Sequence, residues 1–143
     1  MPFSLVQART IADATLADGA ARGFAPLCFV VLDAGGHPLA LLRDERAAIS
    51  RPEIATAKAA GCLGMGLGGR ELARRAQAAP AFFTALAGIF PRGIVPVAGG
   101  ELIRDAAAAM LGAIGVSGDN SDNDEICALA GIAAASLVAD TGA

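Results

Sequence analysis

The chain has 143 residues and a formal net charge of −3, and 55% of its residues are hydrophobic while only 17% are charged. This length fits one domain with one hydrophobic core, so residues 1–143 are expected to form a single domain. The small charged fraction leaves apolar surface uncovered, which favours a homo-oligomer. A negative net charge without a basic cluster, together with the absence of Trp and Tyr, argues against a nucleic-acid partner.

The uncharged runs are too short for a membrane span. Residues 106–118 and 126–139 contain no charged side chain, but both fall below the roughly 18 residues that a spanning helix needs. The first residues also lack the basic and apolar regions of a signal peptide. Three cysteines without CxxC spacing favour reduced thiols over disulfides. We therefore expect a cytoplasmic protein with no membrane association.

The first half of the chain predicts a helix and a hairpin. Apolar residues recur at helical spacing over residues 4–22, and Gly23 follows as a stop. Residues 27–32 form a short apolar run typical of a buried strand. The turn-forming residues 33–38 and the apolar residues 39–43 then predict a returning strand.

A second helix is predicted to begin at Ser50. Ser50 with Glu53 three residues later has the pattern of a capping box, and Pro52 suits the first helical turn. This helix is expected to continue through Lys58 and to end among the glycines of residues 64–69.

The second half of the chain adds two short helices, more strands and a terminal helix. The helices are expected over residues 70–78, 81–87 and 121–138, and the strands over residues 93–97, 101–104 and 110–116. Pro96 would restrict the first of these strands to an edge or a bulge. Hairpin-linked strands with helices packed on them indicate an α+β fold with an antiparallel sheet.

Glycines at positions 112, 115 and 118 almost match several catalytic motifs. Gly115-Val-Ser117-Gly-Asp119 resembles a nucleophile elbow, but it ends in Asp, and the only histidine precedes the serine. The spacing also fits neither a dinucleotide fingerprint nor a P-loop. We interpret this segment as a closely packed strand, followed by an acidic cap of the last helix. The acidic run lacks EF-hand spacing, and no metal site is expected.

Four side chains are the main candidates for chemistry. His37 lies in the predicted turn, either as an exposed residue or as an axial ligand or acid–base group. Lys58 is either paired with Glu53 or an aspartate, or a desolvated amine. Arg43 either pairs with Asp44 or holds a ligand carboxylate. We take Lys58 and Glu53 as the catalytic candidates, and the ligand-binding candidates are Arg43, His37, Gly99 and Gly100.

Four segments resemble the GlcG/HbpS family in order and spacing. They are VVLDAGGHPL at residues 30–39, IATAKAA at residues 54–60, PVAGG at residues 96–100, and GAIGVSG at residues 112–118 with the later Asp124-Glu125. The resemblance covers nearly the whole chain. It implies a profilin- or roadblock-like α/β/α layered domain with a five-stranded antiparallel sheet, assembled into dimers or larger rings.

The resemblance also sets the functional hypotheses. The family includes haem-binding proteins and the C-terminal domain of PduO-type corrinoid adenosyltransferases. It therefore implies an accessory protein of a catabolic pathway that binds a small molecule or a tetrapyrrole, with haem or a corrinoid as the cofactor. One alternative is a cofactor-independent isomerase, tautomerase or lyase acting on a small carboxylate through Arg43, Lys58 and Glu53. A second alternative is a structural, oligomeric interaction module.

Overall fold

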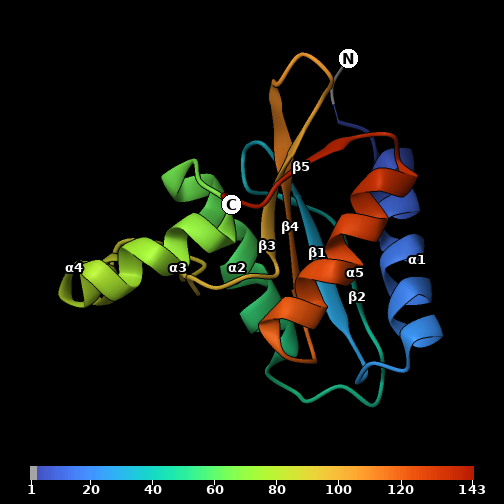
Figure 1. The fold of residues 1–143 in the computed structure, drawn as a ribbon, viewed down its shortest axis with the longest axis horizontal. Helices are drawn as coiled ribbons and strands as arrows, with labels where there is room; N and C mark the ends of the chain where they lie inside the picture. Colours follow the sequence, from blue (N-terminus) through green and yellow to red (C-terminus); the bar gives the residue numbers. More distant parts are fainter. Residues whose placement is uncertain (1–2) are drawn as a thin grey trace.

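The computed structural model describes residues 3–143 and contains an antiparallel sheet with helices on both faces (Figure 1). The strands are β1 (Cys28–Asp33), β2 (Pro38–Arg43), β3 (Gly100–Arg104), β4 (Met110–Ser117) and β5 (Val138–Asp140), in the spatial order β2-β1-β4-β3-β5. The helices are α1 (Leu5–Arg22), α2 (Arg51–Met65), α3 (Gly69–Ala78), α4 (Pro80–Leu86) and α5 (Ser121–Ala134). The predicted α+β fold, an α/β/α arrangement with a five-stranded antiparallel sheet, is confirmed.

The two faces of the sheet bury two separate hydrophobic cores. Helices α1 and α5 cover one face, where Phe29 and Val31 of β1 are buried. Helix α2 crosses the other face, over Cys28, Val30 and Leu32 of the same strand. Because successive side chains of a strand point to opposite faces, a central strand buried on both faces reads as a continuous apolar run.

The glycines of β4 allow α2 to approach the sheet. A Cβ atom built at Gly115 would overlap the carbonyl oxygen of Ala55 on α2. The backbone of the helix therefore occupies the space that a side chain would need. This contact supports the interpretation of the glycine-rich strand as a packing feature.

The β1–β2 and β3–β4 hairpins share one type of turn. In the first, Gly36 N–H donates to Asp33 O at 2.9 Å, and Gly36 has a φ of 84°. In the second, Ala108 N–H donates to Asp105 O at 3.0 Å, and Ala108 has a φ of 67°. Both hairpins show a register shift beside the turn, which fits a β-turn followed by a left-handed bulge residue.

The structure corrects two predicted elements. Residues 93–97 form no strand; instead they run beside α2, where Val95 N–H donates to Ala57 O at 3.3 Å. The last helix ends at Ala134 rather than near residue 138, and Val138–Asp140 forms β5 at the free edge of β3. Ser136, with a φ of 58°, lies in the turn between them.

Helix capping also differs from the prediction. Ser50 precedes α2 but forms no side-chain capping bond, so the predicted Ser50–Glu53 capping box is wrong. A complete capping box occurs instead at α1, between Ser4 and Gln7. The cap of α5 is Asn120, one residue before the predicted start. Within the described residues, no helix is both long and apolar enough to cross a membrane.

Candidate functional site

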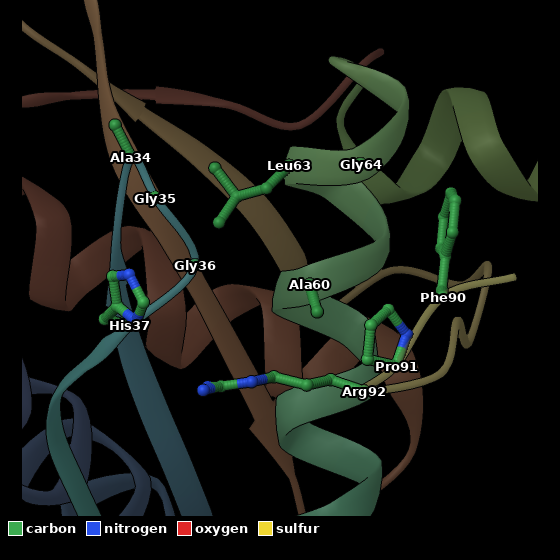
Figure 2. Close-up of a pocket in the computed structure, with 10 residues that line it drawn as sticks. All are labelled: Ala34, Gly35, Gly36, His37, Ala60, Leu63, Gly64, Phe90, Pro91 and Arg92. Atoms are coloured by element: carbon green, nitrogen blue, oxygen red, sulfur yellow. The ribbon is translucent and has the colours of Figure 1, made fainter.

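A pocket of about 390 Å³ lies at one end of the sheet (Figure 2). Three separate segments form its walls: the β1–β2 turn, the second half of α2, and the loop between α4 and β3. The lining residues are Ala34, Gly35, Gly36, His37, Ala60, Leu63, Gly64, Phe90, Pro91 and Arg92. Its volume lies at the lower end of the roughly 300–1,000 Å³ typical of small-molecule sites.

Two polar side chains border this largely apolar pocket. His37, the only histidine of the chain, lies exposed on the β1–β2 turn. Arg92 extends from the opposite wall toward that turn (Figure 2). Among residues 3–143, Arg92 forms no ion pair or side-chain hydrogen bond, so its guanidinium is available to an anionic ligand.

His37, a ligand-binding candidate from the sequence, lines this pocket, whereas Arg92 was not among the candidates. One feature of the sequence indicated that Arg92 lacks a local ion-pair partner: no acidic residue occurs between positions 72 and 100. That signal does not reveal which segment lies opposite, and here the facing turn is more than fifty positions away along the chain.

Lys58 belongs to a second, closed site. Its side chain is 3% exposed, and its Nζ donates to Asp124 Oδ2 at 3.0 Å and to Val116 O at 2.8 Å. The aspartate partner is therefore present, and Glu53 is not the partner. A Cβ at Gly99 would lie 2.9 Å from Nζ, and one at Gly100 would lie 2.7 Å from Lys58 O. The two glycines thus make room for Lys58.

Glu101 lies in the same region as Lys58 and was not among the site residues predicted from the sequence. It is completely buried, and neither carboxyl oxygen has a hydrogen-bond partner among the described residues. Burial is the main cause that raises its pKa, and the charge of Glu125 adds to this. Glu125 itself binds Arg70, with distances of 2.9–3.0 Å to Arg70 Nε. Lys58, Glu101, Asp124 and Glu125 are thus four buried ionisable side chains in one region of the protein.

The other candidates lie apart from both sites. Arg43 Nη1 donates to the carbonyl oxygens of Asp44, Glu45 and Ala47 at 3.0–3.1 Å, so the guanidinium fastens the loop after β2. Arg43 ends the strand that begins directly after His37, and six extended residues separate the two positions by about 20 Å. Glu53 is exposed in the first turn of α2.

The three cysteines are free and buried. Burial raises the pKa of Cys28 to about 11 and that of Cys127 to about 12. Across residues 3–143, no three His, Cys, Asp or Glu side chains converge to hold a metal ion.

The fold and the pocket define a small α/β/α protein with a largely apolar pocket at one end of an antiparallel sheet. The model of the family described as "haem degrading protein HbpS-like" matches residues 3–133, and the chain belongs to this family. The predicted resemblance to the GlcG/HbpS family is therefore confirmed. Comparison with curated proteins found no match.

Several solved structures share this fold. The chain is 31% identical to HbpS over 93% of this chain and 89% of that one, with a TM-score of 0.79. It is 25% identical to protein ORFY of Klebsiella pneumoniae, a DUF336 protein, covering 94% and 90% of the two chains, with a TM-score of 0.82. A PduOC complex with haem is 22% identical over the whole of both chains, with a TM-score of 0.84.

Proposed function

We propose that this protein binds haem, and that its site is the pocket beside His37. The observation that carries the proposal is the position of the chain's only imidazole at a largely apolar pocket, opposite the guanidinium of Arg92, which has no ion-pair partner within residues 3–143. Membership of the HbpS-like family supports it. The haem held by PduOC, a protein of the same fold, supports it further.

The residues present fit the chemical groups of haem. A histidine nitrogen is a common axial ligand of haem iron, which supplies redox and ligand-binding chemistry when bound. The side chains of Ala60, Leu63 and Phe90 offer apolar contact to a planar macrocycle. Arg92 would pair with a propionate at the mouth of the pocket. His37 would therefore hold the haem iron, and Arg92 would orient the haem through its propionate.

A haemin titration tests the proposal. Because the chain contains neither Trp nor Tyr, strong near-ultraviolet absorption or a Soret band must come from a bound ligand. The wild type should give a defined Soret band, and His37→Ala should shift it and weaken binding. Arg92→Ala should weaken binding about threefold, because an exposed ion pair contributes less than about 1 kcal/mol.

Arg9→Ala is the matched control, since it removes an exposed arginine on α1 outside the pocket. A parallel titration with hydroxocobalamin distinguishes a corrinoid from haem. A wild type without a defined haemin spectrum, or a His37→Ala spectrum identical to that of the wild type, contradicts the proposal.

No observation favours the alternative of a carboxylate isomerase, tautomerase or lyase. Its residues do not meet, because Lys58 is buried against Asp124 while Glu53 is exposed and Arg43 holds a loop. The pocket beside His37 contains none of the three.

We further propose that the protein forms a homo-oligomer. We also propose that it is cytoplasmic and serves as an accessory protein of a catabolic pathway. Leu41 and Leu42 are 44% and 46% exposed on β2, a strand at the edge of the sheet, which supports contact with another copy. Three buried, free thiols support a reducing compartment. Light scattering of the purified protein tests the assembly, and a monomer at all concentrations contradicts it.

A further inference from the structure

The turn that carries His37 is held by one side chain, that of Asp33. Asp33 Oδ1 accepts hydrogen bonds from Gly35 N–H at 3.0 Å and from His37 N–H at 2.9 Å. The backbone N–H of Asp33 also donates to His37 O at 2.9 Å. Both backbone polar groups of His37 are therefore bonded to Asp33, which fixes the position from which the imidazole leaves the chain.

The ring of His37 lies against Gly35. A Cβ at Gly35 would be 3.1 Å from His37 Cδ2 and 3.4 Å from Nε2. The first of these distances is tighter than ordinary van der Waals contact, so an alanine at this position would press on the imidazole. The absence of a side chain at Gly35 gives the ring its place beside the pocket.

We propose that Asp33 is a positioning residue that, with Gly35, presents the His37 imidazole to the ligand of the pocket. The inference rests on the proposed function for the identity of that ligand. Asp33 would act only through the backbone of His37, since its carboxylate accepts from the N–H of this residue and not from the ring. The bonds within the turn fix the backbone of His37 before any ligand binds, and the close contact with Gly35 limits where the ring lies.

The second hairpin offers a matched control. Asp105 Oδ1 accepts from Ala107 N–H and Ala109 N–H, both at 2.9 Å, and Asp105 N–H donates to Ala109 O at 3.0 Å. These are the bonds of the first turn, with Ala109 in the place of His37. Asp105→Ala therefore removes the same hydrogen bonds from a turn that carries no imidazole and does not line the pocket.

The first arm of the test is haemin affinity. Asp33→Ala should shift the Soret band and weaken haemin binding by about tenfold, the low end of the range for residues that support a metal ligand indirectly. Asp33→Asn should bind nearly as the wild type does, because its amide oxygen accepts the same bonds. Asp105→Ala should bind as the wild type does. Equal affinities for Asp33→Ala and Asp105→Ala overturn the inference.

The second arm needs no ligand. His37 is the only histidine, so its ring protons give one set of NMR signals. We expect a nuclear Overhauser effect between the Cδ2 proton of His37 and the α-protons of Gly35 in the wild type, Asp33→Asn and Asp105→Ala. In Asp33→Ala this effect should be lost. Persistence of the effect in Asp33→Ala overturns the inference.

Gly35→Ala provides a second variant with the Asp33 bonds intact. It should move the ring signals of His37 and weaken haemin binding, and unchanged signals would overturn the role of Gly35. A wild type that shows no haemin spectrum defeats the proposed function instead, and the NMR arm still decides whether Asp33 positions His37.

Discussion

Glu101 is completely buried at the start of β3 and has no hydrogen-bond partner within the described residues. Glu125 and Asp124 approach it from α5, and Lys58 approaches from α2 while it is bonded to Asp124. Arg70 of α3 is engaged by Glu125. Burial, followed by the charge of Glu125, raises the pKa of Glu101 well above 4.5. The folded protein therefore favours the neutral acid.

This position predicts a loss of stability as the pH rises. Above pH 4.5 the unfolded chain releases the proton of Glu101 while the folded protein still holds it. The free energy of unfolding should then fall by up to about 1.4 kcal/mol per pH unit until the pH passes the pKa of the folded state. The full stabilisation is present below pH 4.5.

Urea unfolding of the wild type and Glu101→Gln at a series of pH values measures this effect. The amide does not ionise, so the variant should lack this part of the slope and gain stability relative to the wild type as the pH rises. Carboxyls with a lowered pKa, such as Asp119 and Glu71, contribute the opposite slope in both proteins and cancel in the difference. Parallel pH curves for the two proteins would disprove a raised pKa at Glu101.

Among single elements, the β3–β4 turn carries the clearest strain. Ala108 takes a left-handed conformation with a φ of 67°, where the matching position of the first hairpin has Gly36 with a φ of 84°. A Cβ in this conformation crowds the following carbonyl oxygen, whereas glycine adopts it freely. The sheet pairing on both sides forces the turn to close in spite of this cost.

Ala108→Gly should therefore stabilise the protein by about 1 kcal/mol, measured by chemical unfolding. The reciprocal change, Gly36→Ala, should destabilise it by a similar amount. Ala106→Gly, in the same turn but without a positive φ, should give no gain, because it adds only freedom to the unfolded chain. An equal gain from Ala106→Gly would refute the explanation by strain.

The two wrong elements show where local patterns are insufficient. Residues 93–97 have the apolar content of a strand, but Ile94 packs against Gly61 on α2, where no ladder partner is available. The apolar pattern predicts a last helix that continues to residue 138, yet the helix ends at Ala134 and Val138–Asp140 pairs with the open edge of β3. In both cases the available neighbour, rather than the intrinsic propensity, decides the conformation.

At the scale of the whole molecule, the three layers depend on close approach between α2 and β4. A methyl group at Gly115 would overlap the carbonyl oxygen of Ala55. Since backbone atoms cannot move aside as a side chain can, the helix and the sheet would have to separate, and the core between them would loosen.

Gly115→Ala should accordingly destabilise the protein by about 3 kcal/mol, the upper part of the range for overpacked cores. Urea unfolding with circular dichroism measures the loss. Gly88→Ala is the control, because a Cβ there meets only Ala85 O at an ordinary 3.5 Å. Equal, small effects of both changes would show that the α2–β4 contact is not tight.

Local signals in the amino-acid sequence were enough to predict most helices and the hairpins, and to show the resemblance that led to the family. Periodicity, turn residues and stop signals act over a few neighbouring positions, so they are legible in a single chain. The place of His37 in a turn could be predicted for the same reason, since that turn lies between two clear strands.

The contacts between groups far apart in the chain could not be predicted in this way and became visible in the folded structure. Lys58 pairs with Asp124, 66 positions away, and Arg70 with Glu125, 55 positions away. The pocket likewise joins His37 to Arg92 and α2 from three separate segments. These contacts depend on which faces of the helices and strands are buried against each other. That burial is set by the packing of the whole chain rather than by any local spacing.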